Sequence, residues 1–211
     1  EVARIYLALH KPPGVDCQPS YDARAIALSL GSLHTLEAVG VRARLADAVT
    51  AIGTVHVSDR GHCGAARIRA AEEGVAALGG VVEARALGGA LHAALEGAPN
   101  IERICPARVE GVATRADGAT VTVDQDGTQR VLEAALVVAA DGGRSALRRQ
   151  ARVRSVGRSY GQHAVIANVV TDRPHGNTAY ERFTDTGPLA LLPFTGGEAG
   201  ARRWGLVWTC R

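Results

Sequence analysis

Residues 137–148 constrain the fold more than any other part of the chain. An apolar run ends at Asp141, two glycines follow, and Ser145 then stands where it can cap a new helix. A buried strand, a tight turn and a helix in this order place backbone amides and a helix N-terminus at the carboxyl end of a sheet strand, where phosphate groups bind. The stretch therefore predicts an α/β fold and makes this turn a candidate site for a phosphate-bearing ligand.

The same turn has two interpretations. In the first, Asp141 accepts hydrogen bonds from sugar hydroxyls, Gly142 lets a ligand approach the backbone closely, and Arg148 adds positive charge. In the second it is a plain turn with a helix cap, because Asp-Gly pairs are common turn formers and the chain has two more, at Asp117 and Asp126. Spacing alone leaves both open.

Arg24 is a second candidate for ligand binding. It stands where a polar loop gives way to the apolar pattern of residues 26–39, so its guanidinium can reach a phosphate or a ribityl chain. The alternative is a surface arginine paired with Asp22. His56, His62 and Cys63 lie close together in sequence, but their spacing matches no zinc pattern, and we predict no metal site.

Composition excludes several classes of protein. The chain has 211 residues, 46% of them hydrophobic and 21% charged, which is typical of a globular protein. Its 24 basic residues are interspersed with 21 acidic ones, and the net charge of +3 gives no basis for a nucleic-acid partner. The four cysteines form no C-x-x-C pair, and we expect free thiols and a cytoplasmic location. No apolar run reaches the roughly 18 residues of a membrane span.

Hydrophobic periodicity and turn residues predict the elements of secondary structure. A β-meander over residues 107–132, with a hairpin turn at Asp126-Gly127, leads into a strand at 135–140 that we expect to be buried on both faces. Beyond residue 152 the residue pattern predicts mainly strands. The remaining predictions are helices at 26–39, 65–77, 87–95 and 145–150, and strands at 5–9, 55–58, 164–170, 179–183, 189–193 and 204–209.

Taken together, these motifs resemble the class A flavoprotein aromatic hydroxylases, which share the para-hydroxybenzoate hydroxylase fold. The strand, the Asp-Gly pair, the serine and the arginine of residues 137–148 are similar to the Asp-Gly motif of that family. Residues 22–29, 56–61 and 160–165 resemble its ubiquinone-biosynthesis branch, and within it the octaprenyl-methoxyphenol hydroxylases. The resemblance extends over nearly the whole chain, from about Arg4 to Arg211.

The resemblance implies cofactors and site residues. FAD would be the cofactor and NAD(P)H the co-substrate, with dioxygen supplying the hydroxyl group. Arg24 would lie near the FAD pyrophosphate or ribityl chain, Asp141 and Gly142 would contact FAD, and Arg148 would brace that loop. No catalytic side chain carries over to this sequence, so the catalytic residues are unknown. For the substrate pocket the candidates are His56, Tyr160 and Gln162.

The implied architecture is mixed α/β. Residues 1–152 would form an FAD-binding, Rossmann-like domain with the β-meander, incomplete at its N-terminus, and residues 153–211 the start of a β-sheet substrate domain, which residues around 45–65 would join. The substrate would be a prenylated phenol. Its isoprenoid tail favours a peripheral contact with the inner membrane, and the pathway suggests a ubiquinone-biosynthesis protein complex as partner.

Several FAD-binding features of the family are missing from the sequence. There is no G-x-G-x-x-G loop, and Leu9-His10-Lys11 stands where the second strand would end in a carboxylate. The later Gly-Asp motif of the family is missing too. The sequence also contains no methionine, not even at position 1. We therefore expect about half of a full family member, truncated at both ends. Two alternatives stay open: an inactive fragment or assembly subunit, and a non-oxygenase FAD oxidoreductase on the same fold.

Overall fold

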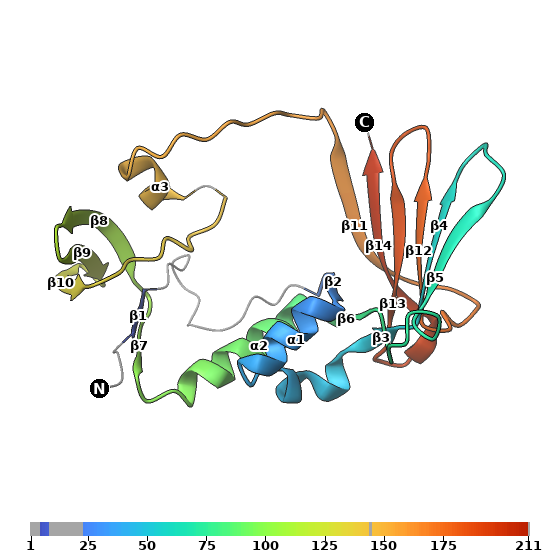
Figure 1. Cartoon of the computed structure of the whole chain (residues 1–211), viewed down its shortest axis with the longest axis horizontal. Coiled ribbons are helices and arrows are strands. Elements are labelled where there is room, and N and C mark those ends of the chain that lie inside the picture. Colours follow the sequence, from blue (N-terminus) through green and yellow to red (C-terminus); the bar gives the residue numbers. More distant parts are fainter. Residues whose placement is uncertain (1–4, 9–22, 144, 211) are drawn as a thin grey trace. The chain divides into compact units, whose positions relative to one another are not determined.

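The computed structural model describes residues 5–8, 23–143 and 145–210 and confirms the mixed α/β fold (Figure 1). The chain forms two compact units, each discontinuous in sequence. The first unit combines Glu1–Gln18 with Gly97–Arg158, and the second combines Pro19–Glu96 with Ser159–Arg211. The sequence suggested one boundary near residue 152 instead, and as a division between functional domains that boundary stays a prediction.

The first unit is built from short sheets. Strand β1 (Ile5–Ala8) pairs in parallel with β7 (Ile101–Ile104), and the predicted meander is confirmed. Asp126 and Gly127 both have positive φ, at 52° and 81°, as the tight turn of a hairpin requires. Buried Ile104 and Val123 join β7 to the meander in one core. The meander strands are β8 (Arg108–Arg115), β9 (Gly118–Gln125) and β10 (Thr128–Ala134).

The prediction of a buried strand at residues 135–140 is wrong. These residues form no strand, and Leu136 and Val138 expose 78% and 74% of their surface. An apolar run becomes a buried strand only where neighbouring strands take up its hydrogen bonds, and no strand among the described residues pairs with this one. The segment is an extended connection into α3 (Ala146–Gln150), which agrees with the predicted helix.

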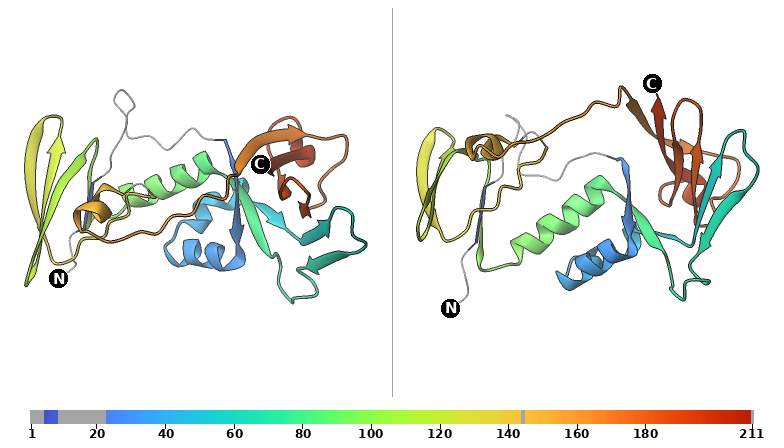
Figure 2. Two further views of the ribbon diagram at one scale, coloured as in Figure 1. Left: turned by 90° about the horizontal axis from the view of Figure 1, so that it is seen from above. Right: turned by 45° about the horizontal axis from the view of Figure 1, so that its top comes forward.

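A small sheet lies at the centre of the second unit (Figure 2). Alternation along its middle strand sends Val82 to one face, where helices pack, and Val81 to the other, where the large sheet packs. A Cβ on Gly80 would collide with the Val49 side chain, so the middle strand needs glycine there. The strand order is β2 (Ala25–Ser29), β6 (Gly79–Glu83), β3 (Thr50–Ile52), and the helices are α1 (Leu30–Ala38), η1 (Arg42–Ala48) and α2 (Ala84–Glu96).

A six-stranded sheet completes the second unit, in the order β11-β14-β13-β12-β4-β5 (Figure 1). The predicted strand at 55–58 and the four predicted strands beyond residue 152 are confirmed. Parallel pairing of β4 with β12 brings residues 54–59 into the sheet formed by the last part of the chain. The bounds are β4 (Thr54–Asp59), β5 (Ala65–Arg69), β11 (His163–Val170), β12 (Thr178–Phe183), β13 (Leu189–Phe194) and β14 (Arg203–Cys210); η2 (Gly200–Arg202) precedes the last strand.

Two predicted helices are wrong in whole or in part. Residues 26–29 are strand, because Ile26 and Leu28 satisfy a two-residue period as well as a helical one and pair with β6. The helix begins only at Leu30, after Ser29 accepts a hydrogen bond from the Ser32 amide at 3.1 Å. Residues 65–77 contain β5 and turns instead of a helix, because Ala65–Arg69 closes a hairpin with β4. The predicted helix at 87–95 is confirmed within α2.

The expectation of free thiols holds for only part of the chain. Cys63 and Cys210 are free, whereas Cys105 is in a disulfide. A prediction from spacing alone misses such a bond, because residues that are distant in sequence can meet in the fold. Leu9–Lys11 and Asp22, which the sequence singled out, lie outside the described residues.

Candidate functional site

The turn that begins at Asp141 is held to α3 by side-chain caps. Asp141 Oδ2 accepts a hydrogen bond from the Ala146 amide at 2.8 Å and has a longer contact of 3.4 Å with the Leu147 amide. Ser145 is buried, and its Oγ accepts from the Arg148 amide at 2.9 Å. These acceptors satisfy N–H groups that have no partner inside the helix. The turn therefore caps α3, as the second interpretation of the sequence predicted.

Capping also affects the charge of Asp141. Its pKa lies below the ordinary value of 3.8, first because the Ser145 side chain hydrogen-bonds the carboxyl group, an effect that desolvation opposes and the backbone amides of Leu147 and Ala146 reinforce. The carboxylate is therefore ionised at neutral pH. A fixed negative charge attracts hydroxyl donors and repels phosphate oxygens. Of the ligand groups considered for Asp141, a sugar-type hydroxyl suits this electrostatic setting.

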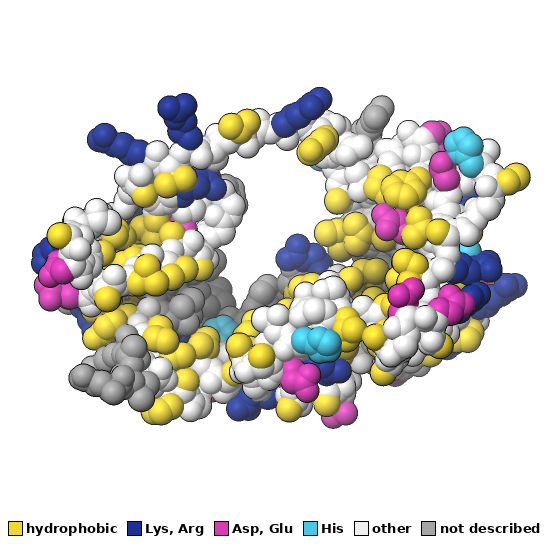
Figure 3. All heavy atoms as spheres, viewed as in Figure 1, with side chains coloured by type: hydrophobic (Ala, Val, Ile, Leu, Met, Phe, Trp, Pro, Cys, Tyr) yellow, Lys and Arg dark blue, Asp and Glu magenta, His cyan; other side chains and the backbone are white. Residues whose placement is uncertain are grey.

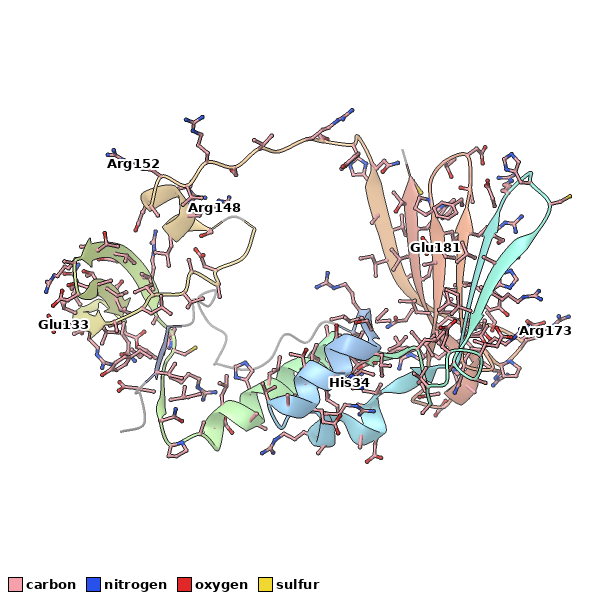
Figure 4. The ribbon with its side chains drawn as sticks, viewed as in Figure 1. His34, Glu133, Arg148, Arg152, Arg173 and Glu181 are labelled. Carbon is pink, nitrogen blue, oxygen red and sulfur yellow. The ribbon has the colours of Figure 1, made fainter. Side chains whose placement is uncertain are left out.

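The backbone after Asp141 is open to a ligand. Gly142 has a φ of +81°, and apart from the chain neighbours no described residue has an atom within 4 Å of the position that a Cβ would occupy on either Gly142 or Gly143. A ligand can therefore approach this backbone without a side chain in the way. Arg148, labelled in Figure 4, turns back from α3 and donates from Nη2 to the Gly143 carbonyl at 3.0 Å, which braces the loop. The loop fits a cofactor that carries hydroxyl groups.

Arg24 belongs to the second unit, whereas Asp141, Gly142 and Arg148 share one loop in the first. Its side chain is exposed and directly precedes β2. The backbone here is held on both sides: Asn168 Nδ2 donates to the Ala23 carbonyl at 2.8 Å, and the Ala84 amide donates to the Arg24 carbonyl at 3.0 Å. These contacts fix the peptide that presents the guanidinium. Cofactor binding by these four residues stays a prediction.

Glu83, which the sequence analysis did not single out, lies beside the Arg24 segment on the neighbouring strand. Glu83 faces Ala25 across the β2–β6 pair and is only 9% exposed. Its carboxylate forms ion pairs with Arg85 and with Arg203, the latter at 3.0 Å, and the Arg203 guanidinium lies 4.2 Å from the centroid of the Phe194 ring. A buried carboxylate needs such partners. The only signal in the sequence is a charged residue at the end of the apolar Gly79–Glu83 strand.

The candidates for the substrate pocket are scattered. His56 packs against Tyr180, with ring centroids 5.3 Å apart, and its Nδ1 accepts from Arg67 Nε at 3.1 Å. Tyr160 is 80% exposed and Gln162 is also exposed. The described residues contain no group of three potential metal ligands, and none of their helices has the length and apolarity to cross a membrane.

The model of the FAD binding domain family matches residues 16–205. The chain belongs to this family. The match covers both Arg24 and the Asp141 loop, so the predicted family membership is confirmed. Two curated proteins are similar to this chain over most of its length. An uncharacterized protein of Synechocystis sp., slr1300, is 32% identical over 88% of this chain. The ubiquinone hydroxylase UbiL of Rhodospirillum rubrum is 33% identical over 90% of it.

This FAD binding domain protein spans only part of its relatives. It covers 44% of slr1300 and 42% of UbiL. Among solved structures, p-nitrophenol 4-monooxygenase PnpA of Pseudomonas putida superposes on 98% of this chain with a TM-score of 0.76, at 17% sequence identity, and the chain covers 57% of it. At that identity the superposition shows a shared fold.

Proposed function

We propose that the intact gene product is an FAD-dependent aromatic hydroxylase that uses NAD(P)H and dioxygen to hydroxylate the phenol ring of a prenylated ubiquinone precursor. The observation that carries the proposal is the braced loop at Asp141–Arg148, with its ionised carboxylate and open glycine backbone, inside a segment that matches the FAD binding domain family. The name of the relative UbiL supports the ubiquinone-related substrate.

Each candidate residue has a distinct task in this proposal. Asp141 accepts hydrogen bonds from cofactor hydroxyls, and the glycines after it let the cofactor approach the backbone. Arg148 keeps that loop in place through the Gly143 carbonyl. Arg24 offers a planar guanidinium to a phosphate or the ribityl chain. When bound, FAD supplies the redox chemistry that activates dioxygen, and the protein supplies orientation and a dry environment.

Flavin content and product coupling test the activity. The purified gene product should contain FAD and oxidise NAD(P)H faster when a prenylated phenol is added. With ¹⁸O₂, mass spectrometry should find one labelled oxygen in the product ring. NAD(P)H consumption without labelled product would favour the alternative of a non-oxygenase FAD oxidoreductase. Lack of FAD in the intact protein would favour a non-catalytic subunit.

Matched glycine variants test the Asp141 loop. Gly142→Ala and Gly61→Ala both place a side chain on a left-handed backbone with open space around it, so their conformational strain is similar. Only Gly142→Ala should weaken FAD binding, by about tenfold, the equivalent of roughly 1.4 kcal/mol. Equal FAD affinity of the two variants, measured by fluorescence titration, would contradict a cofactor at this loop.

Arg24→Ala tests the second contact, with the exposed Arg173→Ala as control. Loss of one charge-assisted hydrogen bond should weaken FAD binding about 10-fold or more, since such bonds contribute roughly 1.5–3 kcal/mol. Arg173→Ala should leave FAD affinity unchanged. If the two variants bind FAD equally well, Arg24 does not contact the cofactor. A peripheral membrane contact and membership of a biosynthetic complex stay predictions of the same proposal.

A further inference from the structure

We infer that Glu181 recognises the ring hydroxyl of a neutral phenol and excludes aromatic carboxylates. The inference rests on the proposed function, because it assigns a specificity-determining residue to the same reaction. Glu181 lies in the middle of β12, at the centre of the large sheet (Figure 4). Its side chain is exposed and makes no hydrogen bond or ion pair with any other part of the chain that the structure describes.

The sheet face that carries Glu181 also contacts the Arg24 segment. Side chains alternate along a strand, so Glu181 and Ala179 point to the same face. Sheet register places Ala179 in one row with Leu192, Gly205 and Asn168. A Cβ on Gly205 would collide with Ala25, and Asn168 donates its hydrogen bond to the Ala23 carbonyl. This row therefore packs directly against the peptide that presents Arg24.

Glu181 stands one row further along the same face. Two residues along a strand correspond to about 7 Å, so Glu181 lies one step beyond Ala179 and is not packed under the small sheet. The Arg24 segment meets the same face at Gly205 and Asn168, two and three strands across from β12. On this face, strand register gives Glu181 only apolar neighbours in its row: Val57, Ala190, Val207 and Ile166. Ile68 and Phe183, also on this face, are 45% and 46% exposed. Figure 3 shows an acidic side chain among hydrophobic ones on this sheet.

This pattern fits one kind of ligand. An apolar sheet surface binds an aromatic ring and an alkenyl chain through burial of apolar area. A carboxylate with only apolar neighbours in its row accepts a strong hydrogen bond from a phenol hydroxyl as water is excluded. The same charge repels a ligand carboxylate. The ligand is therefore a neutral phenol with an apolar substituent, which is the chemistry of a prenylated phenol and differs from that of a benzoate.

The test compares three probes on the FAD-loaded gene product by calorimetry: 2-prenylphenol, 2-prenylanisole and 2-prenylbenzoate. The unaltered protein should bind 2-prenylphenol most tightly. Glu181→Gln, nearly identical in shape, should weaken 2-prenylphenol about tenfold, the equivalent of roughly 1.4 kcal/mol. It should leave 2-prenylanisole unchanged and strengthen 2-prenylbenzoate. Glu181→Leu should likewise lose the preference for the hydroxyl while keeping 2-prenylanisole. The control is Asp172→Asn, an exposed carboxylate on the β11–β12 connection.

The outcomes separate the two proposals. If the unaltered protein binds 2-prenylphenol and Glu181→Gln binds it equally well, the assignment of Glu181 is wrong and the proposed function stands. If the unaltered protein holds FAD but binds none of the prenylated rings, the proposed function fails and the assignment fails with it. An equal change in Asp172→Asn would mean that net charge, not Glu181, sets the preference.

Discussion

Phe194 should be the side chain on which the contact between the two sheets of the second unit depends most. It is 1% exposed at the end of β13 and packs with Ile52, Val81 and Ala179, which come from both sheets. The Arg203 guanidinium lies over its ring. Removing the ring takes away buried apolar area, leaves a cavity that rigid strands cannot collapse into, and ends the contact with the cation.

The size of the effect follows from those contacts. Phe194→Ala should lower the free energy of unfolding by about 3–5 kcal/mol, as buried phenylalanines do when truncated. At about 2–4 °C per kcal/mol for a chain of this size, the melting temperature should fall by roughly 6–20 °C. Phe194→Leu keeps most of the buried volume and should cost less than about 1.5 kcal/mol.

Urea unfolding followed by tryptophan fluorescence measures the loss, because Trp204 and Trp208 both lie on β14 of the affected sheet. The only other phenylalanine, Phe183, is 46% exposed and provides the control. Phe183→Ala should cost less than about 1 kcal/mol, since less area is buried. A loss below 1 kcal/mol for Phe194→Ala, or equal losses for alanine and leucine, would refute this account of the sheet contact.

Three further predictions concern glycine packing and titration. Gly80→Ala should lower the free energy of unfolding by about 1–3 kcal/mol through overpacking, whereas Gly157→Ala, with open space around it, should be neutral in the same urea titration. The lowered pKa of Asp141 means that its stabilising cap is present above pH 3.8 and lost as pH falls through the folded pKa. Asp141→Ala, which removes the acceptor, should speed amide exchange at Ala146, and unchanged exchange would contradict the cap. Burial lowers the pKa of His175 below its ordinary 6.5, so the unfolded chain binds more protons and stability declines as pH falls below 6.5. His175→Gln should flatten that decline, and an unchanged slope would contradict it.

Local signals made part of the structure predictable. The meander followed from Asp126-Gly127, because a two-residue turn with positive φ needs these residue types. The cap at α3 followed from Ser145, whose acceptor acts only three residues away. In both cases the partner groups are neighbours in sequence, so the residues that form the interaction appear together in the pattern.

Sequence patterns did not predict the conformation of segments whose structure depends on pairing with a distant strand. The apolar run at 135–140 has the composition of a buried strand, but burial depends on neighbouring strands that its own residues cannot specify. Ala65–Arg69 was predicted as helix for the same reason, since pairing with β4 decides its conformation. Ile26 and Leu28 fit two periods at once, and only β6 selects between them.

The face that a residue occupies is the hardest property to predict, and substrate residues depend on it. His56 was singled out as a substrate residue, yet the parallel register of β4 with β12 sets it opposite Tyr180, whereas Val57 lies opposite Glu181. Adjacent residues on a strand point to opposite faces, so the sheet face that contacts the Arg24 segment carries Glu181 and not His56. Nothing in the residues near His56 encodes that choice, because it arises from pairing with a strand more than a hundred residues away along the chain. Register, not composition, therefore decides which acidic or aromatic side chain lies on the sheet face that packs against the segment of Arg24, the predicted cofactor residue.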